Sequence, residues 1–578
     1  MNLAFKGKKV YLIGAGSSGL AAAEWLIDKG AEVLMNEAKS FDALGERTRS
    51  ALTELEERGL ALSLGAPPDP VGWGADLVIA SPGVPLSLPG VAEALERGIP
   101  VTNEIELGWQ ACGADVVGIT GSNGKTTVTS LVGQIMRDAG FDPFVGGNIG
   151  TPFITAANEL KPGDWAALEL SSFQLAGILT LAPKVAIILN ITPDHLDWHK
   201  TYEHYARSKW NIAKYQTSRD WLILNRDDPA LREEGELRER ALKARTIEGP
   251  RILWFSKSEP EAEDAAFEAG ESARAAGETG QTAGATEQAA GVTEPGAGEA
   301  KQTTVVTEQT AGVTERASGE SERAASETSP GAGVAKQVTV VTERVAGETD
   351  SGAVFVDTDG WAVYRGAYEY PESGAYKEDT AEGSEVVRLM PVNEFKLPGA
   401  HNLENLLAAL AAGVALGIAP EKLRQSAAAF TALPHRMEPV TEKAGVLYVN
   451  DSKATNPDSA IKALNSYDRP IVLIAGGDAK GVSFDEVAEL IIKKVKAVTL
   501  IGKDRDMIRD TLLSKGFDRI SYADGIEQAA ALCYEVAAPG DIVLLSPACS
   551  SLDMHSSYEE RGNRFKEAVK RLTDDIQE

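Results

Sequence analysis

Short apolar runs alternate with longer stretches of helical spacing along most of this chain. In the first hundred residues the apolar runs are KVYLIGAG, AEVLMNE, ADLVIASPG and IPVTNEIE. A second block opens with DVVGITGSNGKTT and continues through WAALELSSFQL, VAIILNITPDH and DWLILNRDD. A third block contains VLYVNDSK, PIVLIAGG, AVTLIG and GDIVLLSPACSS. Strands that alternate with helices in this way predict βαβ units, and therefore parallel sheets with helices on both faces.

The three blocks predict an α/β protein of three domains. Residues 1–105 should form a Rossmann-like domain, residues 106–432 a central P-loop ATPase-like domain with a parallel-rich sheet, and residues 433–578 a second Rossmann-like domain. The length of 578 residues agrees with this number, because domains usually contain about 100–200 residues.

Residues 257–350, inside the central block, break the pattern. They are rich in Ala, Gly, Glu, Thr and Ser, and they repeat themselves, with KQTTVVTEQTAGVTER at 301 and KQVTVVTERVAGETD at 336. With 18 acidic and 7 basic residues, this segment supplies −11 of the net charge of −28. Its few apolar side chains cannot offset the entropy of ordering, so we expect disorder. It is either a partner-binding arm or an expanded surface loop, and the loop is favoured because closure entropy grows slowly with length.

Charge and cysteine content limit the partners and the compartment. A net charge of −28 would repel a nucleic-acid backbone. The three cysteines, Cys112, Cys533 and Cys549, are too widely spaced for a disulfide framework or a zinc site. The lysines before the first apolar run resemble a secretory leader, but Glu24 interrupts that run, and no stretch reaches the ~18 apolar residues of a membrane span. We therefore expect a soluble cytoplasmic monomer.

The stretch VGITGSNGKTTVT, residues 117–129, indicates a phosphate-binding loop. The full pattern G-x-x-x-x-G-K-[ST] would need a glycine at the position of Ile119, so this loop is a shorter form. A buried strand precedes it and a helical stretch ending at Gly140 follows it. Backbone N–H groups and the helix dipole would then face an anion, with a lysine for the β- and γ-phosphates. The expected ATP contacts are Gly121, Ser122, Asn123, Gly124, Lys125, Thr126 and Thr127.

Polar side chains follow two other strands of the central block. Glu169 ends one apolar run, and Asp194 and His195 come just after another. Ligand sites of open α/β sheets form at the carboxyl ends of the strands, and Mg²⁺ prefers oxygen ligands. Lys209 lies on a helix with other basic residues and, taken alone, is typical of a solvated lysine.

Ten motifs in a fixed order make the chain similar to the Mur ligase family. They are GITGSNGKTT, GGNIG, LELSSFQL, ITPDHLDWH, ARSKWNIAK, LPGAHNLENLLAALAA, LPHRME, VNDSKATNPD, AGGDAKG and LLSPACSSLD. The resemblance covers the chain except for residues 257–350. NDSKATN and SPACSSLD resemble the D-glutamate-adding branch of the family. The Asn-Pro-Arg motif of the diaminopimelate-adding branch is not found.

The resemblance implies ATP-dependent ligation of D-glutamate to UDP-N-acetylmuramoyl-L-alanine through an acyl phosphate, in bacterial cell-wall synthesis. Lys125 would bind ATP phosphates, and Mg²⁺ would be held by Thr126, Glu169, His195 and a carbamylated Lys209. Asn148 would contact the reacting phosphate and the muramoyl substrate. Further implied ATP contacts are Asn402, Asn405, His435, Arg436, Asp451 and Lys453.

The remaining implied residues bind the two other substrates. Those for D-glutamate are Thr455, Lys480, Ser551, Leu552 and Tyr558, the last replacing a phenylalanine of some members. Those for the UDP-sugar are Gly14, Ser17, Ser18, Ser81, Pro82, Gly83 and Ser171. Where members often carry Asp-Thr-Arg, this chain has Asn36, Glu37 and Ala38, which leaves its uracil contacts open.

Three alternatives rest on weaker signals. GAGSSG, residues 14–19, matches the dinucleotide-binding pattern and would suit an NAD-dependent dehydrogenase. The repeats of residues 257–350 would suit a scaffold with an inactive core. A folylpolyglutamate-type ligase would share the chemistry but use L-glutamate. Deletion of residues 257–350 would separate a scaffold from an enzyme.

Overall fold

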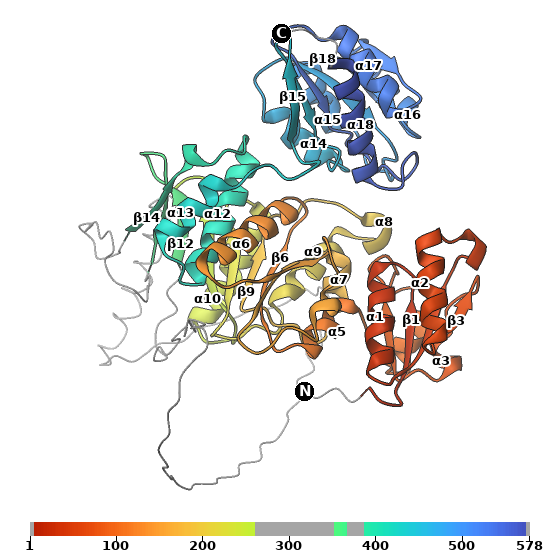
Figure 1. Ribbon diagram of the computed structural model, residues 1–578. Helices are drawn as coiled ribbons and strands as arrows, with labels where there is room; N and C mark the ends of the chain where they lie inside the picture. The colour runs from red at the N-terminus through yellow and green to blue at the C-terminus, as the bar shows by residue number, and fades with distance from the viewer. Residues whose placement is uncertain (1–4, 260–351, 367–385, 574–578) are drawn as a thin grey trace, which may run out of the picture. The chain divides into compact units, whose positions relative to one another are not determined.

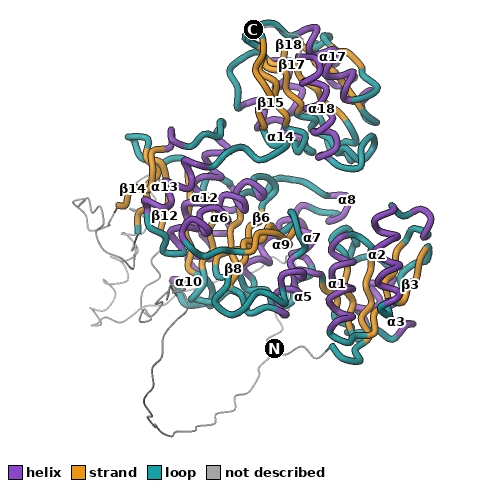
Figure 2. The backbone as a smooth tube through the Cα atoms, in the orientation of Figure 1, coloured by secondary structure: helices purple, strands orange, loops and turns teal. Residues whose placement is uncertain are grey.

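The computed structural model describes residues 5–259, 352–366 and 386–573. It contains three separate β-sheets, each covered by helices, as the sequence predicts (Figures 1 and 2). The expectation of disorder for residues 257–350 lies, except for residues 257–259, outside the described residues. Within the described ranges, no helix is both long and apolar enough to cross a membrane.

The first sheet has five parallel strands in the order β3-β2-β1-β4-β5. Its order reverses between β1 and β4, and ligands of such sheets bind at this switch point, beyond the carboxyl ends of the strands. The strands are β1 (Lys9–Ile13), β2 (Glu32–Glu37), β3 (Ala61–Leu64), β4 (Leu77–Ala80) and β5 (Val101–Thr102). The helices are α1 (Ser17–Asp28), α2 (Glu46–Glu57), α3 (Pro70–Trp73), α4 (Pro89–Glu96) and α5 (Glu104–Ala111).

The second sheet has nine strands in the order β14-β13-β12-β11-β10-β9-β6-β8-β7. The seven strands that lie between β12 and β7 in this order, both included, are parallel. The remaining two, β13 and β14, add an antiparallel edge. The strands are β6 (Asp115–Thr120), β7 (Phe144–Gly147), β8 (Trp165–Glu169), β9 (Val185–Ile188), β10 (Trp221–Asn225), β11 (Arg251–Ser256), β12 (Gly352–Val356), β13 (Trp361–Arg365) and β14 (Val386–Pro391). The helices are α6 (Lys125–Ala139), α7 (Ser172–Ala176), α8 (Leu196–His199), α9 (Tyr202–Trp210), α10 (Pro229–Lys243), α12 (Ala400–Ala415) and α13 (Pro420–Ala429).

The third sheet has six strands in the order β15-β16-β20-β17-β18-β19, and only its β15–β16 pair is antiparallel. The strands are β15 (Glu438–Lys443), β16 (Val446–Asn450), β17 (Ile471–Gly476), β18 (Val495–Ile501), β19 (Ile520–Tyr522) and β20 (Ile542–Leu545). The helices are α14 (Pro457–Asn465), α15 (Asp485–Lys494), α16 (Arg505–Ser514), α17 (Ile526–Val536) and α18 (Tyr558–Thr573).

Burial on both faces explains the apolar runs of the central strands. All four residues of β9 are buried, and alternate side chains enter two different cores. Val185 and Ile187 pack with α6 and α12, whereas Ala186 and Ile188 pack with α7 and α9. A parallel sheet covered on both faces needs such continuous apolar strands.

The first block ends differently from the sequence prediction. The run IPVTNEIE forms a strand only at Val101–Thr102, because the Asn103 side chain accepts hydrogen bonds from the N–H groups of Ile105 and Glu106 and starts α5. The boundary expected at residue 105 therefore falls inside α5. Ile105 packs in the core of the second sheet and Leu107 in that of the first.

Candidate nucleotide and substrate site

The phosphate loop connects β6 to α6, as the sequence predicts. Gly124, at the N-cap of α6, has a φ of 88°, and a Cβ added to it would lie 2.3 Å from Asn405 Oδ1. Only glycine fits both restrictions. Asn190, which follows β9, is joined to the loop by two hydrogen bonds. Its Oδ1 accepts from Asn123 N at 2.8 Å, and its Nδ2 donates to Asn123 O at 3.1 Å.

Two lysines converge on the start of this loop. Lys125 Nζ donates to Gly121 O and Ser122 O, and Lys209 Nζ donates to Gly121 O, all at 2.8 Å. Burial lowers the pKa of Lys125, and it lowers the pKa of the almost fully buried Lys209 well below its ordinary value. Helix composition alone indicated a solvent-exposed lysine at this position. In the structure the Lys209 side chain is buried, and its amine lies inside the site.

Glu169 ends β8 beside this pair and has an unused carboxylate oxygen. Its Oε1 accepts from Asn148 Nδ2 at 2.9 Å, while its buried Oε2 has no hydrogen-bond partner among the residues that the structure describes. Buried carboxylate oxygens without a partner are rare unless a ligand or an ion completes them. Thr126, half-buried in the first turn of α6, adds a hydroxyl to the same strand ends.

The side chains at these strand ends could bind Mg²⁺ only as a mixture of different ligand types. No cluster of three His, Cys, Asp or Glu side chains suited to a metal occurs within the described ranges. A carboxylate, a hydroxyl and an imidazole are nevertheless present, and Mg²⁺ usually keeps several waters and phosphate oxygens as ligands. The unpartnered Glu169 oxygen is the observation that fits a cation best.

His195 lies at the N-cap of α8 in the left-handed region, with φ of 53°. Its Nε2 is 3.6 Å from Asp194 Oδ2, and its ring meets Phe173 edge-on at 4.7 Å. Burial lowers its pKa, and nearby positive charge, including that of Lys480, acts in the same direction. The imidazole is therefore neutral at neutral pH and can act as a ligand.

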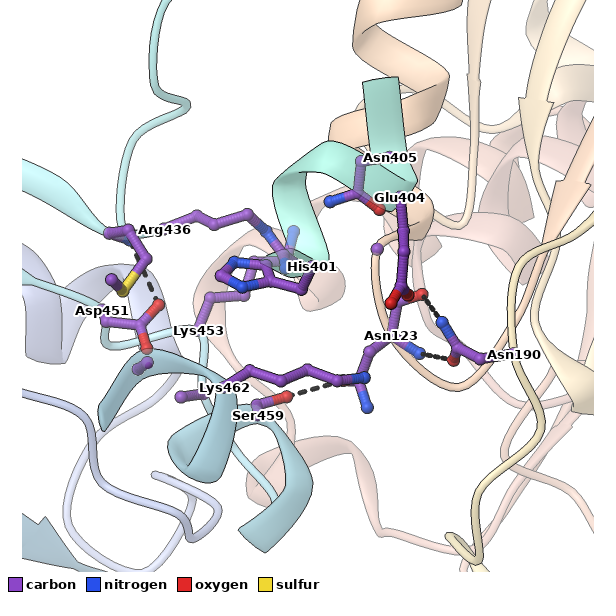
Figure 3. Close-up of a pocket in the computed structure, with 14 residues that line it drawn as sticks. Asn123, Asn190, His401, Glu404, Asn405, Arg436, Asp451, Lys453, Ser459 and Lys462 are labelled. Carbon is purple, nitrogen blue, oxygen red and sulfur yellow. Dashed lines mark hydrogen bonds between the residues drawn. The ribbon is translucent and has the colours of Figure 1, made fainter. Parts of the chain in front are cut away.

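A pocket of about 470 Å³, including its open mouth, lies next to the phosphate loop (Figure 3). Glu404 and Asn405, from α12, lie on one side of it, and Arg436 and Asp451 lie on the other (Figure 3). The lining residues are Asn123, Gly124, Asn190, His401, Glu404, Asn405, Arg436, Met437, Asp451, Lys453, Ala454, Ser459, Lys462 and Ala463. This mixture of amides and cations suits a nucleotide.

Three residues expected from the third block line this pocket. Burial raises the pKa of Asp451 to about 7 and lowers that of Lys453 to about 8. Lys453 Nζ also lies over the Tyr558 ring, 5.0 Å from its centre. Arg436 has a buried Nε without a hydrogen-bond partner. His435 is not part of the lining; it is buried beside Asn450, with its Nδ1 2.9 Å from Asn450 Nδ2.

The expected D-glutamate residues differ widely in exposure. Lys480 and Leu552 are exposed, Thr455 and Tyr558 are half-buried, and Ser551 is buried. Lys480 is in the left-handed region, with φ of 52°, and its N–H donates to Asp478 Oδ1. The positive charge of Lys480 is close enough to His195 to lower the pKa of its imidazole.

Except for Ser171, which caps α7, the expected UDP-sugar residues lie at the switch point of the first sheet. Ser81, after β4, donates from Oγ to Gly14 O, after β1, at 3.2 Å. Ser17 and Ser18 open α1, whose N-cap is Gly16 without a capping side chain. Glu37 Oε2 accepts from Ala15 N at 2.9 Å, whereas Asn36 is buried and donates to Ser63 O and Ala66 O.

Of the other residues chosen from the sequence, three have side chains bonded inside the protein. Asn402 donates from Nδ2 to Pro398 O and accepts at Oδ1 from Asn405 Nδ2. Ser171 forms the capping box of α7 with Gln174. Sequence reasoning did not select Asn190, His401, Glu404, Ser459 or Lys462, although His401 and Glu404 lie inside a motif that it did quote.

Comparison with known proteins decides the family. The chain matches the Mur ligase MurD-like N-terminal domain over residues 8–103, the Mur ligase middle domain over 119–281 and the Mur ligase glutamate ligase domain over 435–549. It is 37% identical over 565 residues to the UDP-N-acetylmuramoylalanine--D-glutamate ligase of Pelotomaculum thermopropionicum, covering 98% of each chain. It is 34% identical over 570 residues to the protein of the same name from Koribacter versatilis, again covering 98% of each. The chain belongs to the Mur ligase family.

Among solved structures, the MurF ligase of Thermotoga maritima in complex with ADP aligns with a TM-score of 0.48 and 15% identity, covering 99% of each chain. The three matched Mur ligase segments follow one another in the order of the three sheets. Family membership agrees with the expectation that the ordered motifs raised.

Proposed function

We propose that this chain is an ATP-dependent amide ligase that adds D-glutamate to UDP-N-acetylmuramoyl-L-alanine in peptidoglycan precursor synthesis. The observation that carries the proposal is the 37% identity to a relative of this name over 98% of both chains. The phosphate loop and the cationic pocket beside it supply the chemistry that such a ligase needs.

Each block takes one share of the reaction. Residues 1–105 bind the UDP moiety, residues 106–432 bind ATP and the reacting carboxylate, and residues 433–578 bind D-glutamate and close on the nucleotide. The glycine turn at Gly14 offers backbone N–H groups to the diphosphate, together with Ser17, Ser18 and the loop Ser81–Gly83.

Phosphoryl transfer relies on positioned cations. The γ-phosphoryl group of ATP passes to a carboxylate oxygen at the alanine end of the substrate, and ADP leaves. Lys125, Arg436 and Lys453 offset the negative charge that spreads over the phosphate oxygens during this transfer. Asn148, already bonded to Glu169, is exposed and available to the reacting groups.

Thr126, Glu169, His195 and a carbamylated Lys209 would hold Mg²⁺. When bound, the ion would neutralise part of the phosphate charge. Lys209 is suited to carbamylation because its amine is buried, and burial lowers its pKa well below the ordinary value and so favours the neutral amine.

Amide formation completes the reaction. The amine of D-glutamate attacks the acyl phosphate, a C–N bond forms, and phosphate leaves as the amine loses a proton. Lys480 and Ser551 hold the carboxylates of D-glutamate, with Thr455, Leu552 and Tyr558 around them. Closure of the third block excludes water, which would otherwise hydrolyse the acyl phosphate. The enzyme acts as a cytoplasmic monomer.

The decisive experiment measures phosphate release from ATP with Mg²⁺ and UDP-N-acetylmuramoyl-L-alanine. D-glutamate, L-glutamate and no amino acid are compared, and the ligated product is identified by its mass. Release that requires D-glutamate is the expected result. Release that requires L-glutamate, or no turnover at all, would reject the proposal.

A further inference from the structure

Three separate segments carry the residues that surround the proposed cation position. Glu169 ends β8, His195 is the N-cap of α8, and Lys209 lies near the end of α9. The geometry of these side chains therefore depends on how α7, α8 and α9 are fixed to one another.

His199 lies in α8 and contacts both α7 and α9. As the last residue of α8, it donates from its backbone N to His195 O at 3.0 Å. Its Nε2 is 2.9 Å from the Oγ of Ser172, which begins α7 three residues after Glu169. Its Nδ1 is 3.0 Å from His204 Nδ1 on α9, and its ring meets the Tyr205 ring edge-on at 5.2 Å.

The His199 ring is fixed in its plane as well as at its ends. It is almost fully buried and stacks on Phe173 of α7 at 5.5 Å, with 8° between the planes. One of the two facing Nδ1 atoms must carry a proton and the other must accept it. An imidazole offers two polar atoms on opposite edges of a flat ring, so it can connect α7 and α9 at once.

The conformation of His195 makes this connection important. His195 is in the left-handed region, which costs a non-glycine residue free energy and persists only where the surroundings impose it. The helix that follows it has only four residues, from Leu196 to His199. Its far end is held by the His199 side chain, and its near end is His195 itself.

We propose that His199 is a positioning residue that sets the mutual geometry of Glu169, His195 and Lys209. The inference deepens the proposed function and rests on it, because the positioned groups are those assigned to Mg²⁺ and phosphate. Hydrogen-bonded residues behind metal ligands typically change metal affinity or activity by about 10–100-fold when they are replaced.

The alternative is a purely structural core histidine, and three substitutions separate the two roles. His199→Phe keeps the flat ring and the stacking but removes the side-chain hydrogen bonds to Ser172 and His204. His199→Gln places an amide near the position of Nε2 and keeps a partner for Ser172. His199→Asn places one near Nδ1 and keeps a partner for His204.

A matched control exists in the third sheet's domain. His555 is also buried, and neither of its ring nitrogens has a hydrogen-bond partner in the part of the chain that the structure describes. His555→Phe therefore repeats the same substitution without removing a hydrogen bond among the described residues; the ring's ion-pair contact, Nδ1 to Glu560 Oε1 at 4.0 Å, is long.

Mg²⁺ affinity is the readout that a purely structural role would leave unchanged. Calorimetry follows Mg²⁺ titrated into protein saturated with a non-hydrolysable ATP analogue, and binding of the analogue without Mg²⁺ is measured separately. For His199→Phe we expect Mg²⁺ affinity and kcat to fall by about 10–100-fold, with metal-free analogue binding unchanged. The Mg²⁺ affinity and kcat of His199→Gln and His199→Asn should fall between those of His199→Phe and the wild type. Both quantities in His555→Phe should match the wild type.

Wild-type Mg²⁺ affinity in His199→Phe would overturn the proposal. So would a loss of metal-free analogue binding in step with Tm, since that result marks a general structural defect. If His199→Phe does not fold, the Gln and Asn variants decide, and wild-type Mg²⁺ affinity in both rejects the role. Wild-type protein that binds Mg²⁺ but shows no turnover with D-glutamate would reject the proposed function, while the order of Mg²⁺ affinities still tests His199.

Discussion

The Nζ atoms of Lys125 and Lys209 share one acceptor, the carbonyl oxygen of Gly121, at 2.8 Å each. The two lysines come from α6 and α9. Burial lowers the pKa of both amines, and the charge of Lys125 lowers the pKa of Lys209 further. A phosphate group would offer both lysines a better partner than a single carbonyl oxygen, since charge-assisted hydrogen bonds are stronger than neutral ones. The phosphate loop is thus poised for an anion.

Lys125→Ala should reduce kcat for D-glutamate-dependent phosphate release by about 10²–10³-fold, the usual effect of removing one electrostatic contact to a transition state. Tm should change little, because the lysine bonds only to its own loop. Steady-state kinetics and a thermal melt check both. A loss of less than about tenfold would contradict its role in phosphoryl transfer.

Lys209 should react with CO₂ because burial holds the pKa of its amine well below the ordinary value, which raises the fraction of the reactive neutral amine. In ¹³C-bicarbonate, ¹³C NMR should show a carbamate carbon that disappears in Lys209→Ala. The exposed Lys214 provides the control, since Lys214→Ala should keep the signal. A carbamate signal that survives in Lys209→Ala would assign the modification elsewhere.

Gly124→Ala should abolish nucleotide binding and lower Tm. The new methyl group would lie 2.3 Å from Asn405 Oδ1, and the residue has a φ of 88°. A strained backbone of this kind costs on the order of 1–3 kcal/mol. Gly140→Ala is the matched control, because Gly140 also has a positive φ, of 94°, but its added Cβ would meet no atom within 4 Å. Gly140→Ala should lower Tm and keep ATP binding; equal ATP affinity in the two variants would contradict the argument.

Asp451→Asn should change how stability depends on pH. Burial raises the pKa of Asp451 from 3.8 to about 7, so the folded protein binds this proton more tightly than the unfolded chain. The stability that protonated Asp451 contributes is full below about pH 4 and is lost as the pH rises through about 7. The asparagine variant cannot ionise, so its advantage in free energy of unfolding should grow across this range, by on the order of 4 kcal/mol. If Tm plotted against pH runs parallel for the variant and the wild type across this pH range, the prediction is wrong.

Lys480→Ala should raise KM for D-glutamate by about 10–100-fold, since a hydrogen bond to a charged group contributes about 1.5–3 kcal/mol. KM for ATP should stay unchanged. Lys503→Ala is the control: this exposed lysine bonds to Asp478, the residue that also accepts from the Lys480 backbone. If both variants raise KM for D-glutamate equally, the effect comes from the Asp478 loop and not from the Lys480 charge.

Local pattern predicted those parts of the site that depend on adjacent residues. The strand, loop and helix around Lys125 follow the sequence prediction, and the helix ends at Gly140 as expected. Short or half-exposed strands such as β3 and β19 were missed, because their few apolar residues give no clear period. β15 was missed as well, since Val440 stands alone among polar residues and a proline in its sequence EPVTEK.

The contacts between distant segments could not be predicted. Asn190 supports the phosphate loop only because β9 lies next to β6, and Asn405 reaches Gly124 only because α12 packs against α6. The order of strands in a sheet is a property of the whole fold, so no local spacing reveals it. For the same reason the helical pattern around Lys209, taken alone, indicated a solvated lysine, and only the family resemblance implied a role in the site.

The pairing of β11 with β12 limits how the chain can be shortened. The two strands are neighbours and parallel, with Leu253 opposite Gly352, so the chain that leaves Ser256 must travel back past a whole strand before it re-enters the sheet. Such a return needs about a dozen residues or more. Excision of residues 257–350 would therefore break the sheet and inactivate the chain even if it is a ligase that does not need the repeats. Loss of function after this excision thus would not show that the chain is a scaffold. A shortened chain that keeps residues 257–264 and 341–351 leaves a sufficient tether, and only in that form can loss of the repeats be separated from loss of the fold.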